Sequence, residues 1–134
     1  MYYSRTVLIG KVIRPNGWPD AVRLHVAENG NKTSTFMLSV KTMVGEYEHD
    51  DWHYIVTFNY VAERCKRLLE EGMEILVEGR FKRRKAGPRG QEKERWELIA
   101  ELVKDENGDM WREPSVDPPK GKVVVRNPAR SENW

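Results

Sequence analysis

The chain has 134 residues, of which 39% are hydrophobic and 33% charged, and its formal net charge is +2. This length is enough for one domain with a hydrophobic core and too short for two. So many apolar residues with so small a net charge exclude a disordered chain. Because Cys65 is the only cysteine, an internal disulfide is also excluded.

The first predicted strand covers residues 7–13, and Gly10 inside it indicates a bend of the kind found at barrel corners. A second strand over 22–26 and a return strand over 36–40 flank Asn29-Gly30, a dipeptide typical of hairpin turns. The next segment, 41–51, breaks the alternation, and we interpret it as a polar loop.

A β-branched and aromatic run predicts a strand over residues 52–58. One helix follows over about 61–71, where apolar residues recur on one face and Gly72 is placed as the C-terminal stop. Strands are then predicted over residues 73–81 and 94–103, joined by a basic hairpin. A short extra strand is predicted near residues 110–111.

If the first hairpin is one long bent strand, the order is three strands, a helix and two strands. A lone helix between the third and fourth strands of a barrel is the layout of the OB fold. We therefore expect an all-β protein with one helix and a five-stranded OB-fold barrel over residues 1–112. Residues 113–134 are rich in proline and predicted to be an extended or disordered tail.

Charge is unevenly distributed along the chain. Residues 80–95 hold eight basic and two acidic side chains, whereas residues 46–51 hold four acidic and no basic ones. Such segregation creates strong local fields even when the net charge is small. Four consecutive cations, Lys82 to Lys85, place charge on both faces of a hairpin, which indicates a solvated arm or a surface for a polyanion.

Trp52, Tyr54, Val56 and Phe58 share one face of their strand by alternation. Single-stranded nucleic acid is bound by stacking aromatic rings together with a basic groove. From the residues alone, the aromatics of this face fit a stacking surface and a barrel core equally well.

The sequence shows no cluster of metal ligands, no Walker-type phosphate loop and no nucleophile motif. We therefore expect no cofactor and no enzymatic activity, although the acids of residues 46–51 leave a magnesium-dependent nuclease as a minor alternative. The N-terminus has no apolar signal segment, and no apolar run approaches the roughly 18 residues of a membrane span. These features predict a soluble, cytoplasmic protein.

Three ordered segments resemble the bacterial-type single-stranded DNA-binding proteins. They are the opening strand 7–12, the run from Trp52 through Gly72, and residues 77–92, which contain an Arg-Lys pair at 84–85 and a Gly-Gln-Glu at 90–92. The resemblance spans residues 4 to about 103. It implies an OB fold and sequence-tolerant binding of single-stranded DNA in replication, recombination or repair. RNA stays an alternative ligand, and a protein-interaction module of a replication assembly stays an alternative function.

The resemblance also implies residue roles. Trp52 and Phe58 match base-stacking positions, and Arg84 and Lys85 match a phosphate-contacting pair. His53 matches a histidine at a subunit interface, within a homotetramer or, in a divergent phage or plasmid member, a dimer. The complete predicted DNA-binding set is Lys11, Trp52, Tyr54, Phe58, Lys82, Arg83, Arg84, Lys85, Arg89 and Trp96.

The chain departs from the family pattern at two stacking positions. Ala86 stands where a tryptophan commonly follows the Arg-Lys pair, and Met43 and Val44 stand where another is often found. Candidate substitutes are Trp18, Tyr47 and Trp96. The family's acidic C-terminal tip has no match in residues 126–134, so the docking of partners through such a tip is not implied here.

Overall fold

The computed structural model describes residues 5–113. Seven strands and one helix follow one another in the order β1 (Thr6–Ile13), β2 (Arg23–Val26), β3 (Lys32–Val44), β4 (Tyr47–Phe58), α1 (Asn59–Leu68), β5 (Glu74–Ala86), β6 (Lys93–Lys104) and β7 (Met110–Arg112). The predicted tail lies outside the described residues apart from Glu113. The extra strand expected near residues 110–111 is confirmed as β7, which pairs with β6.

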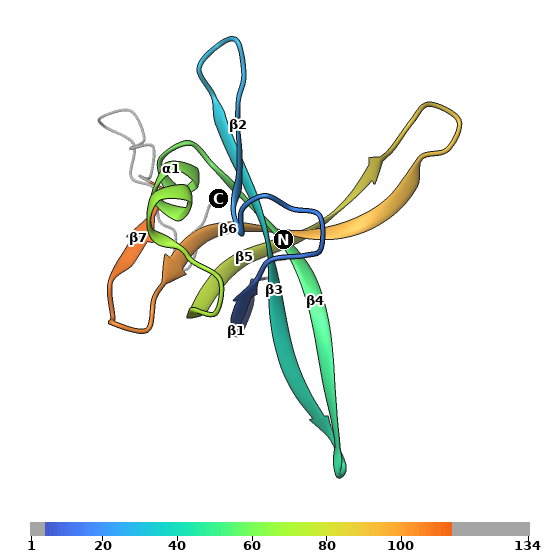
Figure 1. The fold of residues 1–134 in the computed structure, drawn as a ribbon, viewed down its shortest axis with the longest axis vertical. Helices are drawn as coiled ribbons and strands as arrows, with labels where there is room; N and C mark the ends of the chain where they lie inside the picture. The colour runs from blue at the N-terminus through green and yellow to red at the C-terminus, as the bar shows by residue number, and fades with distance from the viewer. Residues whose placement is uncertain (1–4, 114–134) are drawn as a thin grey trace, which may run out of the picture.

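Five strands close a barrel in the order β1-β5-β6-β4-β3, with β3 pairing back to β1. All neighbours are antiparallel except β4 and β6, whose parallel pairing completes the ring. Helix α1 lies between the third and fourth barrel strands in the chain (Figure 1). The predicted OB-fold barrel is confirmed, and β2 lies outside the ring as a short partner of β3.

The predicted bend in the first strand is where β1 changes partner. Residues up to Lys11 pair with β5, and residues from Lys11 onward pair with β3. A Cβ built at Gly10 would lie 2.3 Å from the carbonyl oxygen of Ser39, so only glycine permits this approach of the two backbones.

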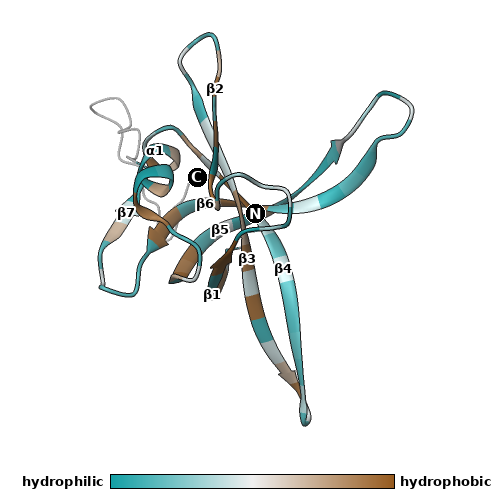
Figure 2. Cartoon of the chain, in the orientation of Figure 1, coloured by the Kyte–Doolittle hydropathy of each residue, from teal (hydrophilic) through white to brown (hydrophobic). Residues whose placement is uncertain are grey.

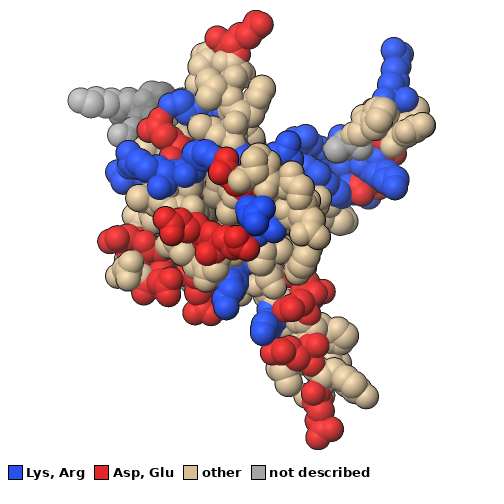
Figure 3. All heavy atoms as spheres, viewed as in Figure 1, with Lys and Arg blue, Asp and Glu red and all other residues tan. Residues whose placement is uncertain are grey.

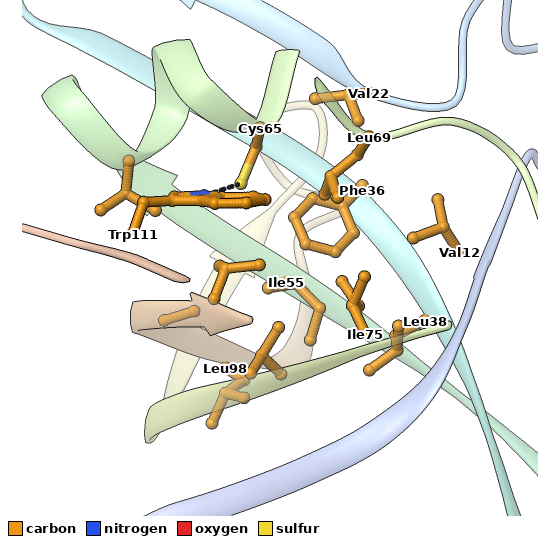
Figure 4. Close-up of a cluster of buried hydrophobic side chains, with 14 residues drawn as sticks. Val12, Val22, Phe36, Leu38, Ile55, Cys65, Leu69, Ile75, Leu98 and Trp111 are labelled. Atoms are coloured by element: carbon orange, nitrogen blue, oxygen red, sulfur yellow. Dashed lines mark hydrogen bonds between the residues drawn. The ribbon is translucent and has the colours of Figure 1, made fainter. Parts of the chain in front are cut away.

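The barrel is filled by the inward-facing side chains of its strands, capped at one side by α1 (Figure 4). Phe36, Leu38, Ile55 and Leu98 are fully buried, and each such side chain stabilises the fold by about 1.5–3 kcal/mol relative to its exposed state. Trp111 of β7 packs on the helix, and its indole Nε1 donates a hydrogen bond to Cys65 Sγ at 3.5 Å. Burial raises the pKa of the Cys65 thiol to about 12.

The prediction of a polar loop over residues 41–51 is wrong. β3 and β4 stay paired from Thr33–Phe58 outward to Val44–Tyr47, and only the turn at Gly45 interrupts them. The pairing persists because charged and polar side chains on opposite strands satisfy each other, as in the Lys41–Glu48 ion pair at 3.8 Å. Polar composition conceals a strand here, since an exposed two-stranded ribbon needs no apolar face.

The helix begins two residues earlier and ends three residues earlier than expected. Leu69 leaves the helix with an extended backbone, which turns its side chain into the core. Gly72 is therefore not the helix stop, and it occupies a left-handed turn position, with φ of +95°, between the helix and β5.

Candidate nucleic-acid interface

Alternation along β4 separates its side chains into a buried row and an outer row. Ile55 and Thr57 are fully buried, whereas Trp52 is 58% exposed and Phe58 42% exposed. Tyr54 is half-buried between them, and Val56 is buried. Trp52 and Phe58 therefore lie outside the core, which rules out the interpretation that they only fill the barrel.

The register across the sheet extends this outer row onto neighbouring strands. Lys11 of β1 lies opposite Ser39 of β3, and Ser39 lies opposite Trp52 of β4. Residues opposite one another in a sheet share a face. The structure thus places the predicted cation Lys11 on the same outer face as Trp52, two strands away.

Tyr54 is held by a network rooted in a buried carboxylate. The Arg95 guanidinium lies 4.0 Å from the centroid of the Tyr54 ring, and Arg95 Nε donates to Glu97 Oε2 at 2.8 Å. Glu97 is 2% exposed, and Arg84 Nε lies 3.8 Å from the same oxygen. One face of the Tyr54 ring is therefore covered by a cation, which leaves at most the other face for a base.

The β5–β6 hairpin extends beyond the barrel and carries the predicted cations (Figure 1). We call residues 82–95 the basic arm, because they include seven basic and two acidic side chains. In Figure 3 this arm is predominantly blue. Arg89 lies in the turn at its tip.

The predicted DNA-binding residues of the basic arm separate onto two faces. Lys82 lies opposite Glu97 and Arg84 opposite Arg95, so these two cations share the face of Tyr54. Arg83 lies opposite Trp96, and with Lys85 they occupy the reverse face. The structure therefore does not bring Trp96 onto the surface that carries Trp52.

His53, the predicted interface residue, lies half-buried beside Phe81. Their ring centroids are 5.8 Å apart at an interplanar angle of 50°. His53 alternates with the outer aromatics and follows the parity of the core, since it lies opposite the buried Leu38.

The remaining candidate aromatics are Tyr47 and Trp18. Tyr47 is 76% exposed near the tip of the β3–β4 hairpin, among acidic side chains. The guanidinium of Arg23 lies 4.9 Å from the centroid of the Trp18 ring. Tyr47 has the strand parity of His53 and lies off the row of Trp52 and Phe58, whereas Trp18 contacts Arg23, a residue of the outer face.

Sequence reasoning left two basic residues out of the predicted set. Arg95 stacks on Tyr54, and Arg23 of β2 lies opposite Thr35, which lies opposite Val56 on the outer face. Their signal in the sequence is strand parity: Arg23 alternates with Val22 and Leu24, and Arg95 shares its parity with Glu97. That parity becomes informative only when the strand pairing is known.

Within residues 5–113, no three His, Cys, Asp or Glu side chains are grouped closely enough to hold a metal ion. No helix in this part of the chain is long and apolar enough to cross a membrane. The outer face carries the exposed rings of Trp52 and Phe58 together with cations, which are groups suited to stacking on bases and pairing with phosphates.

A closed five-stranded barrel with one intervening helix defines this chain as an OB-fold protein. The sequence model of the Single-strand binding protein family matches residues 3–105, and the chain belongs to that family. The resemblance stated from the motifs is thereby confirmed.

Two relatives illustrate the likeness. The single-stranded DNA-binding protein of Thermotoga maritima is 28% identical over 109 residues, which is 77% of this chain and 73% of the relative. A structure of the Plasmodium falciparum SSB in complex with ssDNA superposes with a TM-score of 0.63 at 23% identity, covering 74% of this chain and 87% of that one. At 23% identity, the likeness to the Plasmodium falciparum structure shows the fold alone.

Proposed function

We propose that the protein binds single-stranded DNA without strong sequence preference, by stacking bases on Trp52 and Phe58 and pairing phosphates with nearby cations. The observation that carries this proposal is the exposure of both rings on a face shared with Lys11, Lys82 and Arg84. Membership of the family supports it, as does the ligand named for the Thermotoga maritima relative.

Stacking and charge contribute differently to this binding. Each stacked base stabilises the complex by about 1–3 kcal/mol and tolerates any base, because every base has a π-face. Each phosphate contact releases condensed counterions, so affinity falls with salt by a log–log slope of about 0.7 per contact on a single strand. Specificity for single strands follows, since paired bases cannot present their faces to the rings.

The contacts of Glu97 fix the orientation of Arg95 on this surface before DNA binds. Arg95 is fixed between the Tyr54 ring and the buried carboxylate, so its remaining N–H groups are oriented at little cost in side-chain entropy. We infer that Tyr54 serves chiefly as a platform for Arg95 and contributes one ring face to base contact.

A fluorescence titration tests the proposal directly. Single-stranded oligo-dT should quench the intrinsic tryptophan emission at low salt, and added salt should reverse the quenching. Parallel titrations with oligo-U and with duplex DNA test the ribose and the strand state. If oligo-dT leaves the emission unchanged at low salt, the proposed function is wrong.

We also propose that the protein self-associates, as a dimer or a homotetramer. Within the described residues, one edge of β1 from Thr6 to Ile9 has no strand partner, and its side chains Val7 and Ile9 are exposed. An unpaired edge with apolar side chains favours addition of another strand. His53 is proposed to lie at such an interface, and native mass spectrometry would contradict the proposal by showing only monomers.

The cellular role that fits this binding is protection of single strands in replication, recombination or repair, in the cytoplasm and without catalysis. A labelled single strand incubated with the protein and Mg²⁺ should therefore stay intact. Progressive shortening of the strand by a homogeneous preparation would contradict this part of the proposal.

A further inference from the structure

The reverse face of the basic arm carries its own ring and cations, facing away from Tyr54. Trp96 is 59% exposed, and the neighbouring side chain of Arg83 is exposed to the same extent. Lys85 continues this face one step farther along the arm, opposite Glu94. We call Arg83, Lys85 and Trp96 the far face, and Lys82, Arg84 and Arg95 the near face.

The two faces cannot be covered by one straight segment of nucleic acid. Side chains on successive residues of a strand point to opposite sides of the sheet. A backbone that follows Trp52 and the near face therefore lies on one side of the two-stranded ribbon, with the far face behind it. Binding along the row of Trp52 leaves Trp96 uncovered.

The chemistry of the far face matches that of the proposed binding surface. The Arg83 guanidinium lies 5.7 Å from the centroid of the Trp96 ring and 3.7 Å from Glu94 Oε2, so Arg83 is oriented beside an exposed indole. An exposed indole offers a stacking surface, and adjacent cations offer phosphate contacts. Two cations against one acid leave this face with a positive balance.

We propose that the far face binds a second segment of single-stranded nucleic acid, so that one basic arm holds two segments, one on each face. The inference rests on the proposed function and extends it from coating a strand to bridging two strand segments. The second segment belongs either to another molecule or to a distant part of the same strand, and both present the same bases and phosphates.

Two matched variants separate the faces. Arg83→Gln with Lys85→Gln removes two charges from the far face, and Lys82→Gln with Arg84→Gln removes two from the near face. All four residues are exposed and lie on β5, so the variants share element, net charge and exposure to solvent. Thermal unfolding verifies that both variants fold like the parent protein.

The readout uses the full chain with short oligo-dT labelled with either a donor or an acceptor dye. The parent protein should quench in two phases, and energy transfer between donor and acceptor should rise in the second phase. The far-face variant should keep the first phase and lose the rise in energy transfer that accompanies the second phase, and the log–log salt slope of its second phase should fall by about 1.4, or 0.7 for each lost contact. The near-face variant should weaken the first phase. Trp96→Phe should abolish tryptophan quenching in the second phase only.

Each other result overturns the inference. Equal weakening of the first phase by both variants means one continuous site, and a second-phase rise in energy transfer that survives in the far-face variant means bridging by other residues. A changed subunit number in the far-face variant, seen by native mass spectrometry, means that the face contacts a second copy. If the parent protein quenches in a single phase, only this inference fails, whereas no quenching at all defeats the proposed function itself.

Discussion

Two hairpins leave the same barrel in different directions, and they carry opposite charge (Figure 1, Figure 3). Residues 41–51 of the β3–β4 hairpin, which we call the acidic arm, contain four acidic and one basic side chain. The basic arm contains seven basic and two acidic ones. Both are regular antiparallel ribbons, so the backbone does not distinguish them. What differs is the field that each presents to a polyanion.

This contrast in charge indicates which arm a bound DNA strand follows. A phosphate near the acidic arm meets Glu48 and Asp50, whereas one near the basic arm meets guanidinium and ammonium groups. Figure 2 adds a second contrast, because β3 in the acidic arm carries hydrophobic patches and the basic arm is almost wholly hydrophilic. We expect the DNA to leave the barrel along the basic arm alone.

The largest effect, on the stability of the fold, is expected from substituting Gly79, the glycine at the root of the basic arm. A Cβ at Gly79 would lie 1.8 Å from the backbone oxygen of Ile99, where a bulge shifts the β5–β6 register. Gly79→Ala should therefore force the strands apart and destabilise the fold by about 3 kcal/mol or more, measured by urea unfolding.

The matched control is the turn glycine of the acidic arm. Gly45 has φ of +63°, and a Cβ added to it would meet no other atom within 4 Å, so Gly45→Ala should cost only about 1 kcal/mol of backbone strain. Equal destabilisation by both changes would show that the close approach at Gly79 does not support the arm.

The next largest effect concerns the charge of the basic arm. Changing Arg83, Arg84 and Lys85 together to Ala should weaken binding to oligo-dT strongly and lower the log–log salt slope, summed over both binding phases, by about 2. Filter binding at several salt concentrations measures both. Arg64→Ala with Arg67→Ala on α1, away from the arm in Figure 1, should leave the slope nearly unchanged. A similar loss from the helix changes would mean that net charge, not the arm, governs binding.

Stacking should have a smaller effect than the loss of three cations. Trp52→Ala should cost about 1–3 kcal/mol of binding free energy and leave the melting temperature almost unchanged, because the side chain is mostly outside the core. Tyr47→Ala, which removes an exposed ring from the acidic arm, should alter neither quantity. Isothermal titration calorimetry distinguishes the two, and equal losses would place the strand on both arms.

The contrast between the arms also explains how far the sequence could be interpreted. The basic arm was predicted because four consecutive cations cannot be buried, and the barrel followed from the alternation of its core strands. The acidic arm was predicted as a loop, because Lys41 to Asp51 lack the apolar alternation that marks a half-buried strand. Its strands form by extending a register already set inside the barrel by pairs such as Leu38 and His53, which no local pattern records.

The candidate site, like the arms, could be predicted from the sequence only in part. Residue type alone indicated Trp52, Phe58 and the cations, but the division of the basic arm into near and far faces depends on the pairing of β5 with β6. The role of Arg95 likewise depends on Tyr54 and Glu97 being opposite each other across the parallel β4–β6 pair, 43 positions apart in the chain. Long-range register of this kind is a product of barrel closure.

The smallest effect expected is that of neutralising the acidic arm. Glu46→Gln, Glu48→Gln and Asp50→Asn together remove three negative charges, and Asn at position 50 can still accept the hydrogen bond from Ser39 Oγ, which is 3.3 Å long. If the strand avoids this arm, the acids act only at a distance, and affinity for oligo-dT should rise by no more than a few-fold at low salt.

Screening provides the decisive measurement. Exposed charges separated by more than a Debye length of about 8 Å are largely screened at physiological ionic strength, so the gain in affinity should almost vanish there. A gain in affinity that persists at that salt concentration, with variant and parent protein separated by the same factor as at low salt, would mean that the DNA strand touches the acidic arm. In that case Met43, Val44 and Tyr47 at its end would be contact residues, and the path along the basic arm would be only half of the interface.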